Sequence, residues 1–166
     1  MAVKEKKGPD EDPLGEAKQY IQLLTRYRPR TRKEVEDRLG EKDFSPEIIS
    51  SAVGWARRHD LVNDEAFAKL WIDDRLQRKP KGRNALYKEL LDHGVEKAVA
   101  EDVLDQKLSD VKSAELCREL AEQRLKRYRG DQVKAKYRKT ANFLTRRGFR
   151  KGLVHRILRD LLFGDE

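Results

Sequence analysis

Three copies of one helical corner constrain this sequence more than any other feature. The corners lie at Phe44, Val95 and Phe149, so successive copies are 51 and 54 residues apart. Each corner residue is apolar, and so are the positions five before it and four, five, eight and nine after it. The positions four, five, eight and nine residues after the corner lie on one face of a helix. A unit this short buries little surface alone, so the pattern predicts a tandem array whose units share interfaces.

The third copy is the clearest of the three. Gly148 precedes Phe149, and a glycine supplies the left-handed conformation that ends a helix while the next apolar residue packs back onto it. The second copy keeps this glycine as Gly94. The first copy has Asp43 there and Gly40 earlier, so we expect its turn to differ.

Helical spacing of apolar residues predicts about nine helices in three groups of three, and therefore an all-α fold. Residues 1–15 carry few apolar side chains and predict a disordered tail, with the first helix starting at Ala17. We expect three-helix repeats over residues 16–62, 63–109 and 110–163. Charged residues make up 41% and the apolar class 37%, and so little core for so much charge indicates an elongated array.

The net charge of +8 is concentrated in the last third of the chain, where residues 111–166 hold 16 basic and 7 acidic side chains. This asymmetry predicts a polyanionic partner, either single- or double-stranded DNA, RNA, or an acidic protein surface. The alternative is that these cations only solvate helices. The candidate binding residues are Arg124, Lys126, Arg127, Arg129, Lys134, Lys136, Arg138, Lys139, Arg146, Arg147, Arg150 and Lys151.

A second, smaller basic patch lies at the first turn of the middle repeat. Its members are Arg75, Arg78, Lys79, Lys81 and Arg83. A solvated helix surface explains this patch as well as a binding role does.

No pattern of catalytic or cofactor-binding residues emerges, so we expect neither an enzyme nor a cofactor. The three histidines, His59, His93 and His155, lack partners at metal-ligand spacing, and the phosphate loop Gly-x-x-x-x-Gly-Lys is absent. The single Cys117 lies among apolar residues and reads as a buried thiol. No apolar run spans a bilayer, so we expect a cytoplasmic protein with no membrane or small-molecule partner, and a monomer.

Several segments of the chain resemble the RecX family of recombination regulators. Residues 27–35, Tyr-Arg-Pro-Arg-Thr-Arg-Lys-Glu-Val, resemble the first-repeat segment, and residues 61–68, Leu-Val-Asn-Asp-Glu-Ala-Phe-Ala, resemble the most recognisable element of the family. Residues 82–95 are similar to the second-repeat pattern, and Arg146-Arg147-Gly148-Phe149 to the third-repeat corner.

The resemblance implies a curved array of three tandem three-helix repeats that binds in the groove of the RecA–DNA filament. It further implies that the protein modulates, usually inhibits, RecA ATPase, strand exchange and co-protease activities in DNA repair and the SOS response. The alternative is a free-standing DNA- or RNA-binding module, a transcription or chromatin factor. Acidic residues on the third helices of the first two repeats argue against reading of a DNA groove by those helices: Glu47, Glu96, Glu101 and Asp102.

Overall fold

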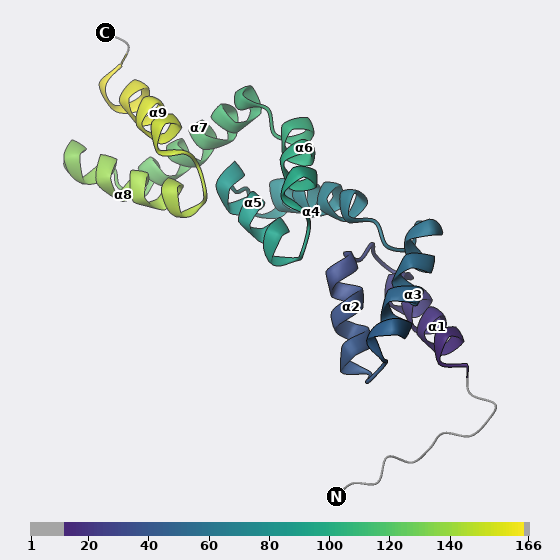
Figure 1. The fold of residues 1–166 in the computed structure, drawn as a ribbon. Helices are drawn as coiled ribbons and strands as arrows, with labels where there is room; N and C mark the ends of the chain where they lie inside the picture. Colours follow the sequence, from purple (N-terminus) through teal and green to yellow (C-terminus); the bar gives the residue numbers. More distant parts are fainter. Residues whose placement is uncertain (1–11, 165–166) are drawn as a thin grey trace, which may run out of the picture. The chain divides into compact units, whose positions relative to one another are not determined.

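The computed structural model describes residues 12–164, and over this range the chain forms nine helices and no strand (Figure 1). The helices are α1 Pro13–Thr25, α2 Arg32–Glu41, α3 Pro46–Arg58, α4 Asp64–Arg78, α5 Arg83–Asp92, α6 Lys97–Lys107, α7 Asp110–Lys126, α8 Val133–Arg146 and α9 Lys151–Phe163. The all-α prediction is confirmed. No helix within residues 12–164 is both long and apolar enough to cross a membrane.

The first helix begins earlier than predicted. Most of the predicted tail, residues 1–11, lies outside the described residues, but residues 13–15 belong to α1 rather than to a tail. The Asp12 side chain accepts a hydrogen bond from the Gly15 backbone N–H at 2.8 Å, and Pro13 occupies the first helical position. A capping aspartate followed by proline is a strong helix start, and the polar composition of the segment concealed it.

The chain divides into two compact units, residues up to Phe67 and residues from Ala68. In the first unit α1, α2 and α3 enclose a core that includes Ile21, Val35 and Leu39. The Thr31 side chain caps α2 in a complete capping box with Glu34. The segment before α4 closes this unit, because Asn63 caps α4 through the Ala66 N–H and the Asp64 carboxylate accepts from the Arg32 N–H at 2.8 Å.

In the second unit, the helices of the middle and third repeats each pack around the apolar columns found in the sequence. Leu90, Val103 and Leu104 are fully buried between α5 and α6, and Leu144 and Leu158 between α8 and α9. Burial raises the pKa of the Cys117 thiol, in the core of the third repeat, to about 11.

The three corners share one hydrogen-bonding pattern, so the expectation of a different first turn is wrong. The backbone N–H of Phe44, Val95 and Phe149 donates to the carbonyl five residues earlier, at 3.3, 3.0 and 3.2 Å. The residue before each corner has a positive φ, 60° at Asp43, 83° at Gly94 and 90° at Gly148. Asp43 therefore serves in place of glycine, because aspartate tolerates the left-handed region better than most side chains do.

Two glycines bring the middle and third repeats into backbone contact. The Gly82 N–H donates to the Arg147 carbonyl at 2.8 Å, and the Asn84 N–H donates to the Gly148 carbonyl at 3.1 Å. A Cβ on Gly82 would lie 2.4 Å from the Gly148 carbonyl carbon, and one on Gly148 would lie 2.4 Å from Ala85 Cβ. The missing side chains are thus what allows the corner of the third repeat to seat on the start of α5.

Candidate nucleic-acid interface

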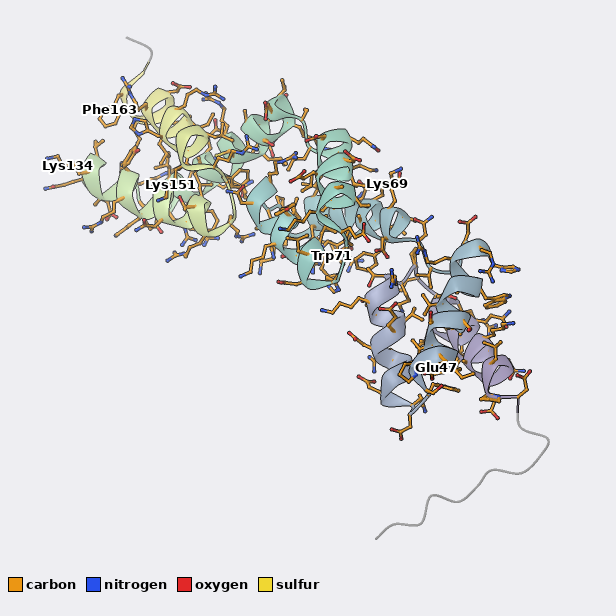
Figure 2. All side chains as sticks on the ribbon, viewed as in Figure 1. Glu47, Lys69, Trp71, Lys134, Lys151 and Phe163 are labelled. Atoms are coloured by element: carbon orange, nitrogen blue, oxygen red, sulfur yellow. The ribbon has the colours of Figure 1, made fainter. Side chains whose placement is uncertain are left out.

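The twelve basic residues predicted to bind are gathered by three elements of the third repeat. They lie at the end of α7, along α8, at the start of α9 and in the two connections between these helices, with Lys134 and Lys151 at the starts of α8 and α9 (Figure 2). Nine of the twelve are exposed, and only Arg124, Lys136 and Arg147 are half-buried. Their charges therefore face solvent or lie at its edge.

Little of this charge is paired with an acidic side chain within the part of the chain that the structure describes. Among residues 12–164, only Lys139 of the twelve forms an ion pair, with Asp131 at 2.7 Å. The first turns of α8 and α9 contain no acidic residue, and neither helix has a side-chain cap. Cations at a helix N-terminus oppose the helix dipole and cost stability. Helix stability therefore does not explain the cations at the starts of α8 and α9, whereas binding of an anion does.

Three of the predicted residues converge on a small cleft between α7 and α8. The cleft has a volume of about 150 Å³ and is lined by Arg124, Arg127 and Arg147 together with Leu120, Gln123 and Phe143, with no carboxylate among them. The guanidinium groups of Arg124 and Arg147 lie 4.5 and 5.1 Å from the centre of the Phe143 ring. Stacking on one ring holds both groups in place before any ligand arrives.

The hydrogen bonds of this arginine cleft are incomplete. Arg147 donates to the Pro80 carbonyl at 3.2 Å, which fixes its position against the middle repeat. Arg124 Nε is buried and has no hydrogen-bond partner among the described residues. A buried donor without an acceptor is costly, and a phosphate oxygen is an acceptor that suits a guanidinium. The cleft therefore combines three guanidinium groups with no carboxylate, which is a lining that suits a phosphate.

The second basic patch differs, because four of its five residues are already paired with carboxylates. Glu89 on α5 accepts from Arg75 Nε at 3.1 Å and from Lys81, and it also accepts from the Trp71 indole at 2.9 Å. Arg78 pairs with Asp74, and Arg83 with Asp105. This patch therefore offers less uncompensated charge to a ligand, and its binding role stays a prediction.

The network around Glu89 joins α4 to α5 and was not foreseen from the sequence. Burial alone raises the pKa of a carboxyl group, but the hydrogen bonds from Lys81, Trp71 and Arg75 outweigh it and lower the pKa of Glu89. The Arg75 guanidinium stacks at 4.1 Å from the centre of the Trp71 ring. The basic residues of the middle repeat thus hold its helices together.

Models of three RecX domains match the chain in order. The first three-helix domain matches residues 23–55, the second residues 63–104 and the third residues 110–158. The chain belongs to the RecX family. The family that the sequence resembles is therefore confirmed, and all twelve candidate residues lie within the third RecX domain.

Relatives across much of the chain carry the same name. The regulatory protein RecX of Streptomyces lividans is 31% identical over 95% of this chain and 84% of its own length, and that of Corynebacterium efficiens is 32% identical over 92% and 74%. The crystal structure of RecX from Lactobacillus salivarius matches 90% of this chain and 97% of its own, with a TM-score of 0.85 and 28% identity. The Streptomyces and Corynebacterium relatives are named as regulatory proteins.

Proposed function

We propose that this RecX protein binds the RecA–DNA filament and modulates, usually inhibits, the ATPase, strand-exchange and co-protease activities of RecA. Family membership supports RecA as the partner. The unpaired cations of the third repeat support direct contact with the phosphates of the filament's DNA, single- or double-stranded. We expect that contact to be independent of the DNA sequence, because cations that bind phosphates do not distinguish one base from another.

The test of regulation is a titration of the protein into RecA assembled on single-stranded DNA, below one molecule per RecA. We expect the rate of ATP hydrolysis to fall and strand exchange to slow. Unchanged ATPase and strand exchange, together with no binding to the filament, would refute the proposal. Tight, sequence-selective DNA binding at physiological salt without RecA would instead favour a free-standing DNA-binding factor.

The test of the interface is charge reversal at Arg146, Arg150 and Lys151. All three are exposed and lie outside the apolar core, so helicity should be unchanged. We expect DNA affinity to fall by about tenfold or more, and the slope of log affinity against log salt to become shallower by about 2 to 3. The same slope in the variant and in the parent would place the interface elsewhere.

A matched control reverses three other exposed cations, Arg57, Arg58 and Lys97, which lie outside the third repeat. The net change in charge is identical, so a general electrostatic effect would weaken both variants equally. We expect the control to retain most of its affinity and its salt dependence, because local phosphate contacts determine both.

A further inference from the structure

Tyr27 is the most exposed large hydrophobic side chain within residues 12–164, with 84% of its surface accessible. It lies two residues after the end of α1 and outside the apolar core of the first unit. An aromatic ring held in water gains nothing for folding from its apolar surface. The ring is therefore available for a contact outside the chain.

The surroundings of Tyr27 are cationic. Residues 26–33 carry five basic side chains and no acidic one. The Arg26 guanidinium lies 5.6 Å from the centre of the Tyr27 ring, and Arg26 has no ion pair among the described residues. Arg28 is oriented by a two-point ion pair with Glu34, at 3.2 and 3.3 Å. An exposed ring beside an unpaired guanidinium is the pairing that single-stranded nucleic acids exploit.

A cavity of about 310 Å³ opens beside the ring, between the connection that follows α1 and the one that precedes α4. These two connections run alongside each other, since Arg30 and Val62 form an isolated parallel bridge. The apolar part of the lining is Pro29, Leu61 and Ala66. An apolar floor beside an exposed ring suits a flat aromatic group.

The polar groups of the cavity are arranged for a base rather than for a phosphate. Asp60 lines the cavity, and its carboxylate repels an anion but accepts a hydrogen bond from an exocyclic amino group. Asn63 also lines it. The Asn63 side-chain oxygen accepts from the Ala66 N–H at 2.9 Å, which leaves the Asn63 amide nitrogen to donate to another acceptor. The cavity thus offers two cations, Arg26 and Arg28, beside the acceptor of the exposed Asp60 and the amide of the half-buried Asn63.

We infer that this cavity, the Tyr27 pocket, binds an unpaired nucleobase of a single-stranded nucleic acid. The base stacks on Tyr27, Asp60 accepts from its amino group, and Arg26 contacts the adjoining phosphate. Cytosine has such an amino group and thymine has none, so the pocket prefers cytosine. The site is separate from the cations of the third repeat and does not require RecA.

The test is fluorescence anisotropy with labelled 12-residue oligonucleotides of deoxycytidine or thymidine, in the absence of RecA. We expect Tyr27→Ala to weaken binding of the cytidine strand by about 5- to 100-fold, as alanine substitution of a base-stacking ring does, and Tyr27→Phe to retain it. Leu23→Ala, which removes another exposed side chain from α1, is the matched control and should bind as the parent does. Asp60→Asn keeps a residue that tolerates the φ of 54°, and it adds an amide donor that can serve the thymine carbonyl, so it should weaken the preference for cytidine.

A duplex of the same length separates base stacking from charge, because its bases are already stacked. We expect Tyr27→Ala to bind duplex DNA as tightly as the parent. An equal loss for both DNA forms, or no loss for the single strand, would overturn the inference. A variant that binds single strands normally but binds RecA poorly would overturn it too, since Tyr27 would then contact a protein. The two DNA measurements contain no RecA, so their outcome does not depend on whether the chain regulates RecA.

Discussion

Gly82→Ala tests whether the middle and third repeats are joined by a backbone crossing. The new Cβ would lie 2.4 Å from Gly148 C and from Phe149 N, where ordinary contacts are 3.4–4 Å. The two backbones must separate by about 1 Å to relieve this overlap. The two hydrogen bonds at 2.8 and 3.1 Å between them are then lost or stretched.

The cost follows from these contacts. Each lost backbone hydrogen bond removes about 1 kcal/mol, and Gly82 is buried, so a donor left without a partner costs about 1–3 kcal/mol. We expect the free energy of unfolding of the second unit to fall by about 2–4 kcal/mol. With a urea dependence of about 1.5 kcal/mol per molar, the unfolding midpoint should fall by about 2 M.

The assay uses tryptophan fluorescence in a Trp55→Phe background, which leaves Trp71 on α4 as the single tryptophan and as a reporter of the second unit. The matched control is Gly152→Ala on α9, where a Cβ meets nothing within 4 Å. That substitution should raise stability by about 0.5–1 kcal/mol through helix propensity. A Gly82→Ala midpoint equal to that of the parent would refute the tight crossing.

Three further outcomes follow from the described contacts. The pKa of Glu89 is lowered in the folded state, so its stabilising effect is complete above the pKa of an unfolded glutamate, about 4.3, and is lost as the pH falls below that value. Glu89→Gln should therefore lower the urea midpoint at pH 7 and lower it much less at pH 3. The raised pKa of Cys117, about 11, predicts slow thiol–disulfide exchange with Ellman's reagent at pH 8 that becomes fast in urea, followed by the thiolate that the reagent releases. Asp43→Gly should stabilise the first unit by about 1 kcal/mol in thermal unfolding, because glycine adopts the φ of 60° without strain, and Asp43→Ala should not.

The apolar columns were predictable from the sequence because periodicity in a helix depends on local spacing alone. Leu39, Leu90 and Leu144 are all fully buried, as their shared column indicates. The turn at the first corner was not predictable, because its sequence lacks the glycine that marks the other two corners. Asp43 nevertheless adopts the same left-handed backbone conformation, with a φ of 60°. The start of α1 was missed because its capping residues are polar and resemble a tail.

The candidate site was predictable only as a list of charges. Nothing in the spacing of Arg124, Arg127 and Arg147 shows that they surround one cleft, because that depends on how α7 packs against α8. Likewise, the basic residues around residue 80 look available until Glu89 is seen among them. A glycine at position 82, where the first repeat has the capping Thr31, is the one local signal that a second backbone comes close there.

Arg147 has two attachments, and they couple properties that otherwise look separate. Its guanidinium lines the arginine cleft and also donates to the Pro80 carbonyl across the junction of the two repeats. Thermodynamic linkage makes this coupling reciprocal. If an anion bound in the cleft changes the equilibrium constant for forming the junction by some factor, forming the junction changes the affinity for the anion by the same factor. The response of the second unit to urea should therefore change with phosphate concentration, and a substitution at Pro80 or Gly82 should change anion affinity without touching the cleft.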